Sequence, residues 1–258
     1  MNGRRPAMLQ SIRLRLVRNT WERLARLDPY WAILNEPVWR HERADLEHFF
    51  AGGRTLVARQ LAQVASVCPD LRSARALDFG CGVGRLSVGL AAVFREVVGV
   101  DISAGMISLA RQHHATVPNL TFVRSVRSDL QGFPTGSFDL VYSLITLQHV
   151  PRLLIEAYLR EFVRICRTGG LLLFQLPARE VAPARRNLWS VWPPTVAVRL
   201  RRVFNRLIPI SPIIDVHCLP PEEVRAILSS AGATVLAQWP DDSTGPVYES
   251  FLYLARKG

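Results

Sequence analysis

The chain has 258 residues, 49% of them hydrophobic, and a formal net charge of +11 at pH 7. This size and composition are typical of one large globular α/β domain and exclude a disordered chain. The four cysteines lack metal-ligand spacing, and the N-terminus lacks an apolar signal core. No apolar run reaches the roughly 18 residues of a membrane span. Together these observations predict a cytoplasmic protein.

The positive charge is concentrated in two segments, residues 1–27 and 179–206. Each contains seven Arg and one Glu, so each carries +6 and the rest of the chain carries −1. Aliphatic residues alternate with these arginines, and Trp189 and Trp192 lie in the second segment. Such segments are typical of chains that lie on anionic lipid, which predicts peripheral membrane contact. The alternative is that both segments pack on the domain and expose their arginines to water.

The hydrophobic pattern predicts the elements in chain order. Residues 1–27 have the spacing of an amphipathic helix, and 43–67 is helical in period with an expected interruption at Gly52-Gly53. From Arg75 strands and helices alternate, which is typical of a doubly wound sheet. The predicted strands are 76–80, 96–101, 120–124, 138–143, 169–176, 233–239 and 247–255. The predicted helices among them are 84–93, 103–115, 151–167 and 220–231.

Two departures from this alternation define the domain organisation. Residues 178–215 contain five prolines among arginines and tryptophans and form a basic insertion. The connection before the last strand is too short for a parallel crossover, so the last strand should run antiparallel. We therefore predict a helical segment over 1–70 and an α/β domain over 71–258 that carries the insertion.

A chemical motif lies in the stretch from Ala76 to Leu86, which reads as a strand, a glycine turn and the start of a helix. Gly80, Gly82 and Gly84 allow a tight turn and the close approach of a ligand. Asp101 ends the next apolar run, where a carboxylate can accept hydrogen bonds from a ribose diol. The motif therefore predicts a crevice for a cofactor that carries adenosine.

The spacing around this turn indicates which cofactor. The third glycine lies one place too early for G-x-G-x-x-G, and no Lys-Ser or Lys-Thr follows as in a P-loop. Asp78, two residues before the first glycine, would repel a pyrophosphate but suits a ligand with an ammonium and a sulfonium. This pattern resembles motif I of the class I S-adenosylmethionine-dependent methyltransferases. The resemblance implies S-adenosylmethionine as cofactor, no metal, and a Rossmann-like sheet of order 3-2-1-4-5-7-6 whose last strand is antiparallel.

The resemblance also implies which residues hold the cofactor. Asp129 matches the family's Asp that meets the adenine amine, and a plain helix N-cap is the alternative. Ile102 and Met106 match apolar contacts to the adenine ring, and core positions are the alternative. Cys81 is expected to be a small filler in the turn. The expected cofactor residues are Asp78, Gly80, Cys81, Gly82, Gly84, Asp101, Ile102, Met106, Ser128, Asp129, Leu130 and Ser143.

The loop after the fourth strand, residues 144–151, should face the reactive end of the cofactor. It resembles the loop of small-molecule methyltransferases and lacks the Asn-Pro-Pro-Tyr of enzymes that methylate amino groups of nucleobases and glutamine. For a hydroxyl acceptor, His149 and His217 are candidate general bases, and a structural role is the alternative for each.

In similar methyltransferases an N-terminal helical segment covers the cofactor crevice, so residues 1–70 are expected to form a lid. His113, His114 and Arg85 are expected on the solvated surface. The candidate lid contacts are Tyr30, Trp31, Gly53 and Arg54. The expected substrate-side residues are Tyr30, Trp31, His149, His217 and Tyr248.

The resemblance predicts a methyltransferase that acts on a small-molecule, lipid or glycan acceptor, with oxygen as the favoured methylated atom. The net charge of +11 suggests RNA or protein as an alternative acceptor. The basic segments do not resemble an RNA-binding module, so nucleic acid is not the expected partner. An alternative of another class is a binding scaffold without catalysis. The presence of Asp78, Asp101 and Asp129 argues against it, because a scaffold need not keep cofactor ligands.

Overall fold

The computed structural model describes residues 4–34, 45–127, 129–181 and 215–258. Three helices lead the chain, namely α1 (Arg4–Leu27), α2 (Pro29–Leu34) and α3 (Leu46–Val67). They are followed by β1 (Arg75–Phe79), α4 (Ser87–Ala91), β2 (Glu96–Asp101), α5 (Ala104–His113), β3 (Leu120–Arg124), β4 (Phe138–Ser143), the 3₁₀ turn η3 (Leu147–His149), α6 (Arg152–Ile165), β5 (Cys166–Glu180), α8 (Pro221–Ser230), β6 (Ala233–Pro240) and β7 (Tyr248–Lys257). These elements agree with the predicted alternation, except that α4 is shorter and β5 longer than expected.

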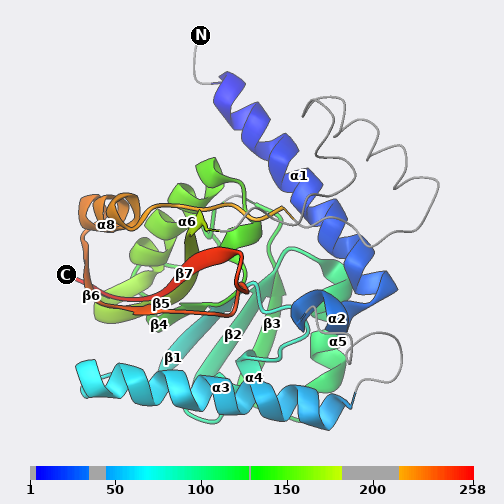
Figure 1. Ribbon diagram of the computed structural model, residues 1–258. Helices are drawn as coiled ribbons and strands as arrows, with labels where there is room; N and C mark the ends of the chain where they lie inside the picture. Colours follow the sequence, from blue (N-terminus) through cyan, green and yellow to red (C-terminus); the bar gives the residue numbers. More distant parts are fainter. Residues whose placement is uncertain (1–3, 35–44, 128, 182–214) are drawn as a thin grey trace.

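Seven strands form one sheet in the order β3-β2-β1-β4-β5-β7-β6 (Figure 1). Neighbours among β1 to β5 pair in parallel, whereas β7 runs antiparallel to both β5 and β6. The predicted fold class, strand order and antiparallel last strand are therefore confirmed. The physical reason is the short connection between β6 and β7, which can only return the chain beside itself.

The two faces of the sheet are covered by different helices (Figure 1). On one face α6 and α8 pack on a core that includes Leu77, and on the other α3, α4 and α5 pack on a core that includes Ala76. Successive side chains of a strand point to opposite faces, so these two neighbours belong to different cores. β4 is buried along its whole length, as expected for a parallel strand that is covered on both sides.

α3 differs from the prediction at its two glycines. The sequence predicts an interruption at Gly52-Gly53, but the helix runs through both to Val67. Gly53 allows a close contact, because a Cβ there would lie 2.2 Å from the carbonyl oxygen of Arg85. A mid-helix glycine costs about 1 kcal/mol relative to Ala, and burial of Val57 and Val64 against the sheet offsets this cost.

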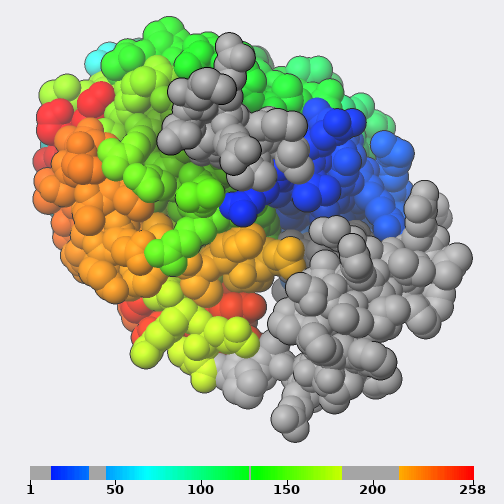
Figure 2. All heavy atoms as spheres, turned by 90° about the horizontal axis from the view of Figure 1, so that it is seen from above, coloured from blue at the N-terminus to red at the C-terminus, as the bar shows by residue number. Residues whose placement is uncertain are grey.

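The N-terminal segment divides into two parts. α1 and α2 lie beside the cavity at the carboxyl ends of β1 and β2, with Trp21 and Ile33 among its lining residues. In Figure 2 their blue atoms adjoin the green and orange parts of the chain. Within the expected lid of residues 1–70, α3 does not line this cavity, because its apolar side packs on a face of the sheet. No helix in the described ranges is long and apolar enough to cross a membrane.

The predicted insertion also has a different start. β5 continues to Glu180, and its last residues pair with β7 through Arg179 with Glu249 and Glu180 with Tyr248. Residues 178–180 therefore belong to the sheet. Residues 182–214, which hold most of the basic segment, lie outside the described residues.

Candidate functional site

One cavity lies where the glycine turn after β1 meets the end of β2. We call it the cofactor cavity; it encloses about 110 Å³. Its floor comes from the glycine turn and Asp101, its cover from α1 and α2, and one wall from the loop after β4. Parallel sheets place their ligand sites at this edge, where the strand order reverses. The position of the cavity therefore follows from the topology.

The glycine turn opens toward this cavity. Gly80, Gly82 and Gly84 all have positive φ, at 77°, 53° and 83°. The Gly82 N–H donates to Asp101 Oδ2 at 3.0 Å, and a Cβ on Gly82 would lie 3.1 Å from the Ile33 side chain of α2. The turn can thus present its backbone to a ligand beneath the lid without interference from a Cβ.

Two carboxyl groups face the cofactor cavity, of which Asp78 is fully buried and Asp101 is half-buried. Asp78 accepts a hydrogen bond from the Ser87 hydroxyl at 2.5 Å, and burial raises its pKa to about 7. Asp101 accepts from the backbone N–H groups of Gly82 and Ser103, yet burial still raises its pKa. Neither carboxyl forms an ion pair within the described part of the chain. A cation beside them would favour their charged forms, so a ligand with a sulfonium and an ammonium fits these two carboxylates.

Cys81 also lines this cavity. Its thiol is buried, and burial followed by the charges of Asp101 and Asp78 raises its pKa well above the ordinary value. The thiol is therefore protonated at neutral pH, and a thiolate nucleophile is not available here. This agrees with the interpretation of Cys81 as a small filler.

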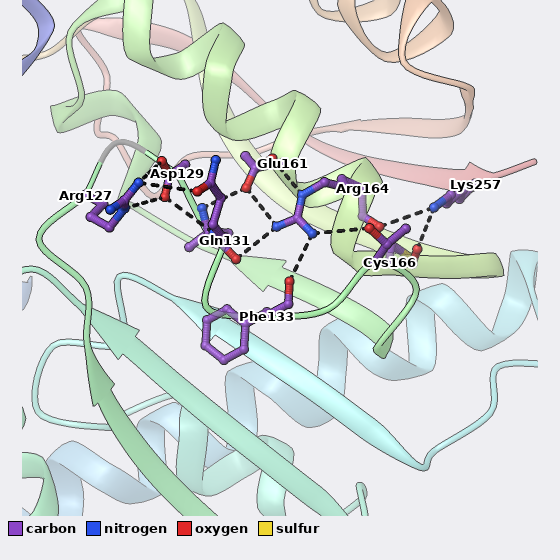
Figure 3. A network of polar contacts seen from close by, with 10 residues as sticks. Arg127, Asp129, Gln131, Phe133, Glu161, Arg164, Cys166 and Lys257 are labelled. Atoms are coloured by element: carbon purple, nitrogen blue, oxygen red, sulfur yellow. Dashed lines mark hydrogen bonds and ion pairs between the residues drawn. The ribbon is translucent and has the colours of Figure 1, made fainter. Parts of the chain in front are cut away.

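The loop after β3 is attached to α6 (Figure 3). Glu161 Oε2 accepts from the Leu130 N–H at 2.7 Å, and Arg164 donates to the carbonyl oxygens of Leu130 and Phe133, each at 2.9 Å. The hydroxyl of Tyr158, which lines the cofactor cavity, donates to the Arg127 carbonyl at 3.0 Å. Side chains of α6 therefore hold this loop at Arg127, Leu130 and Phe133.

Asp129 lies on this loop and is engaged with Arg127. The two side chains form an ion pair at 2.9 Å, and a hydrogen bond from Arg127 is the largest of the interactions that lower the pKa of Asp129 (Figure 3). Asp129 does not line the cofactor cavity, and Ser128 lies outside the described residues. The adenine contact of Asp129 stays a prediction, and it requires the carboxylate to leave Arg127.

The remaining expected cofactor residues fall into two groups. Ile102 lines the cofactor cavity, whereas Gly84 lies behind it in the turn. Met106 and Leu130 are buried in the cores, and Ser143 is buried with its hydroxyl donating to the Phe79 carbonyl at 3.0 Å. These last three residues shape the site from behind.

A second cavity adjoins the first at the loop after β4. We call it the acceptor cavity; it encloses about 600 Å³ and includes Trp31, Leu56, Arg59 and the loop after β6. Five residues line both cavities, namely Ile33, Arg85, Leu144, Ile145 and His149. The two cavities therefore meet at a shared wall. Tyr248 lines a third cavity of about 800 Å³ farther along β7.

His149 is half-buried on this shared wall. Its Nδ1 lies 3.1 Å from the Asp215 carbonyl oxygen and its Nε2 lies 3.1 Å from the Gln148 amide nitrogen. A carbonyl oxygen only accepts, so Nδ1 carries the proton and Nε2 has the lone pair. Burial lowers the pKa of His149 to about 4, which keeps the ring neutral. Trp21 of α1 packs on this ring at 5.5 Å between centroids.

Besides His149, Trp31 lines the acceptor cavity, but the other predicted substrate-side residues and lid contacts do not line the shared wall. His217 lines neither the cofactor nor the acceptor cavity, and its backbone N–H donates to the Gln148 carbonyl at 2.7 Å. Burial lowers the pKa of its ring. Tyr30 forms a 2.8 Å hydrogen bond with His113 instead of reaching a cavity. Gly53 packs on Arg85, and Arg54 is exposed on α3.

Three residues expected on the solvated surface are packed. His114 is 6% exposed, lies 4.8 Å from the Phe50 ring, and has a pKa that burial lowers to about 4. His113 bonds Tyr30, so this pair joins α5 to α2 and α3. Arg85 donates from Nε to the Phe49 carbonyl at 3.2 Å and lies over the Phe49 ring. The cause is that α2 and α3 cover the C-terminal end of α5, and that α3 also packs against Arg85.

Sequence reasoning missed the residues that α1 contributes. Leu14, Val17 and Trp21 line the cofactor cavity, and they share one side of an arginine-rich helix. Their spacing of three and four residues is the signal that could have identified them. Sequence reasoning also missed Gln175, a buried side chain of β5 that contacts the loop after β4, and no local pattern marks it.

Comparisons with known proteins agree with this geometry. A family described as "Methyltransferase domain" matches residues 77–174. The "Ubiquinone biosynthesis O-methyltransferase" of Xanthomonas oryzae pv. oryzae is 32% identical over 189 residues, which cover 72% of each chain. The "Trans-aconitate 2-methyltransferase" of Deinococcus radiodurans is 38% identical over 149 residues, 56% of this chain and 52% of that one.

The fold is also found in solved structures. The magnesium protoporphyrin IX methyltransferase from Synechocystis, crystallised with bound SAH, superposes with a TM-score of 0.62 at 18% identity. The match covers 95% of this chain and 99% of that chain. At this identity the similarity shows a common fold.

Proposed function

Since the chain belongs to the S-adenosylmethionine-dependent methyltransferases, we propose that it methylates a hydroxyl or carboxyl oxygen of a small-molecule or lipid-type acceptor. The observation that carries this proposal is the shared wall between the cofactor and acceptor cavities. Bound S-adenosylmethionine supplies an activated methyl group on a sulfonium, so the chain's own residues mainly position the acceptor and accept its proton.

The residues that would hold the cofactor lie around the first cavity. Asp101 would accept hydrogen bonds from the ribose, and Asp78 would stabilise the cationic part of the ligand. Gly80 and Gly82 line this cavity at positive φ, so the turn presents backbone atoms to the ligand. Ile102 would pack on the adenine ring, and Asp129 would reach its amine after leaving Arg127.

The acceptor cavity supports a small and partly apolar acceptor. Trp31, Leu34 and Leu56 give it apolar walls, while Arg59 and His149 add polar groups. The relatives named above are methyltransferases of ubiquinone biosynthesis and of trans-aconitate, which favours an oxygen acceptor. A wide basic groove, as an RNA acceptor would need, is not supported by this lining.

We propose His149 as the general base in preference to His217. His149 lines both cavities, and its ring is neutral. Its Nε2 has the lone pair that would take the acceptor's proton. The Gln148 amide at 3.1 Å must move aside for this transfer. His217 would then support the loop through its backbone bond to Gln148.

We further propose that residues 1–27 and 179–206 bind anionic membrane surfaces and bring a hydrophobic acceptor to the site. The support from the described part is α1, where Arg13, Arg15 and Arg26 are exposed together with Leu16 and Leu27. Cosedimentation with anionic and neutral liposomes tests this. Salt-sensitive binding to the anionic vesicles is expected, and its absence would leave a basic lid without membrane contact.

The methyltransferase proposal is tested with S-adenosylmethionine that carries a radiolabelled methyl group. The protein is incubated separately with a catechol, a tricarboxylic acid, bulk RNA and a protein mixture, and label is counted in each product. Label in the small acceptors is expected. Label only in RNA or protein would overturn the acceptor class, and cofactor binding without transfer to a wide panel would favour a scaffold.

A further inference from the structure

Ile145 is the only non-glycine residue with positive φ in the described ranges, at 54°. The left-handed region is strained for a β-branched side chain, and such strain persists only where the surroundings hold it. Ile145 also lines both the cofactor cavity and the acceptor cavity. The strained residue therefore lies on the wall where the two cavities meet.

The side chain that holds Ile145 is Gln175 of β5. Gln175 is fully buried, and its Oε1 accepts a hydrogen bond from the Ile145 N–H at 3.1 Å. Because a backbone N–H only donates, the amide oxygen must face Ile145 and the amide nitrogen must face away. That nitrogen donates to the hydroxyls of Thr244 at 2.7 Å and Ser250 at 2.5 Å. Contacts on both sides thus fix the orientation of the carboxamide.

The left-handed turn continues into a contact with the glycine turn. The Thr146 hydroxyl lies 3.3 Å from the Gly80 carbonyl oxygen and 3.1 Å from that of Leu144. A Cβ on Gly80 would lie 2.1 Å from the Thr146 methyl group, so the two segments touch directly. The conformation of Ile145 therefore determines how the loop after β4 meets the cofactor-binding turn.

The same buried groups continue to His149. Thr244 donates to Gln148 Oε1 at 3.1 Å, and the Gln148 amide nitrogen faces His149 Nε2. One carboxamide on β5 thus connects the strained turn to the loop after β6 and, through Gln148, to the histidine. Such networks of buried hydrogen bonds make a single arrangement more stable than its alternatives.

We propose that Gln175 is a positioning residue, which holds Ile145 in its left-handed conformation and so sets the wall shared by the cofactor and acceptor cavities. The assignment of the two cavities to cofactor and acceptor rests on the proposed function. The clamp itself, from Gln175 to Ile145, can be tested without any acceptor.

The test is a double-mutant cycle with S-adenosylhomocysteine as the probe. Gln175→Met keeps a side chain of similar size but removes the oxygen that accepts the hydrogen bond from the Ile145 N–H. Ile145→Gly lets the backbone at this position adopt positive φ without a clamp. Gln175→Met is expected to weaken binding about fivefold when Ile145 is present and less than about twofold in the Ile145→Gly background. The loss in urea midpoint should show the same coupling. Equal losses in both backgrounds would overturn the proposal.

Ser250→Ala is the matched control. It removes one of the two hydrogen bonds on the other side of the same carboxamide. Thr244 still holds that side, so the effect should be nearly equal in both backgrounds. If Gln175→Met alone fails to fold, its combination with Ile145→Gly is still expected to fold, because a glycine at this position does not need the clamp. The ¹³Cα shift of Ile145 is a readout that needs no ligand, and it should leave its left-handed value in Gln175→Met. If no variant binds the probe, wild type included, the proposed function fails while this shift and the urea cycle still decide the clamp.

Discussion

Glu22 of α1 accepts a hydrogen bond from the Ala104 N–H at 2.7 Å and so caps α5. Gly105 N–H and the Ser103 hydroxyl donate to the same carboxylate, and Arg124 pairs with it at 3.1 Å. Burial raises the pKa of Glu22, but these interactions outweigh it and lower the pKa below its usual range. A carboxylate at a helix N-terminus is stabilised by the helix dipole. The first helix is therefore attached to the segment that follows Asp101.

This attachment predicts that Glu22 controls the lid. The cofactor cavity encloses about 110 Å³, below the roughly 300–1,000 Å³ of small-molecule sites, so we expect α1 and α2 to move when the cofactor binds. Glu22→Ala should weaken lid docking by about 1.5–3 kcal/mol, the cost of charged hydrogen bonds. Faster tryptic cleavage within residues 4–34 is the expected readout. Asn19→Ala, an exposed change on the same helix that leaves every tryptic site in place, is the control, and equal cleavage rates in all three proteins would contradict the attachment.

Asp101 is predicted to dominate cofactor affinity. Asp101→Ala removes the ribose acceptor and the partner of the Gly82 N–H, which should weaken S-adenosylmethionine binding by more than about tenfold. Isothermal titration calorimetry measures this directly. Glu96→Ala at the exposed start of the same strand is the control and should bind like wild type. Unchanged binding by the Asp101 variant would remove Asp101 from the site.

Tyr158 is predicted to preorganise the loop after β3, which carries Asp129. Tyr158→Phe removes the hydrogen bond to the Arg127 carbonyl, worth about 0.5–1.5 kcal/mol, so the KM for the cofactor should rise about two- to tenfold with kcat unchanged. Tyr253→Phe is the matched control, because the Tyr253 hydroxyl is buried without a partner among the described residues. A fall in kcat with constant KM would argue against this role.

His149 is predicted to act as the base. His149→Asn can still donate to the Asp215 carbonyl but cannot take a proton, so turnover of a hydroxyl acceptor should fall by roughly 10²–10⁴-fold with cofactor binding kept. His217→Ala should have the smaller effect. Because the pKa of His149 is about 4, the acid limb of kcat/KM should lie near pH 4. A limb near the ordinary histidine value, or small losses in both variants, would indicate that positioning alone suffices.

His114 is predicted to make folding acid-sensitive. Burial lowers its pKa from 6.5 to about 4, and the nearby positive groups His113 and Arg54 lower it further. The unfolded chain thus binds more protons between these values, so stability is complete above pH 6.5 and falls toward pH 4. Urea unfolding at pH 7.5 and pH 5 should therefore show a larger loss for wild type than for His114→Gln. The raised pKa of Asp78 makes its contribution to stability grow as the pH falls. This contribution is the same in wild type and His114→Gln, so it cancels in the comparison. Equal losses would contradict the assignment.

The sequence by itself determined the features that depend on neighbouring residues. Alternation of apolar segments predicted the strands and helices, and the short last connection predicted an antiparallel β7. Gly80, Gly82 and Asp101 were recognisable because backbone freedom and strand-end position are local properties. The fold class and a cofactor that carries adenosine followed from these features, whereas the strand order and S-adenosylmethionine followed from the resemblance to the methyltransferases.

Only the tertiary structure decided which distant residues meet. It placed Trp21 against His149, buried His114 under α3, and brought Gln175 to Ile145 thirty positions away. A sequence pattern shows which side of an element is apolar, but it does not show which element covers that side. The partners of a buried polar group are set by packing between elements that are remote along the chain, and these partners decide its charge and its role.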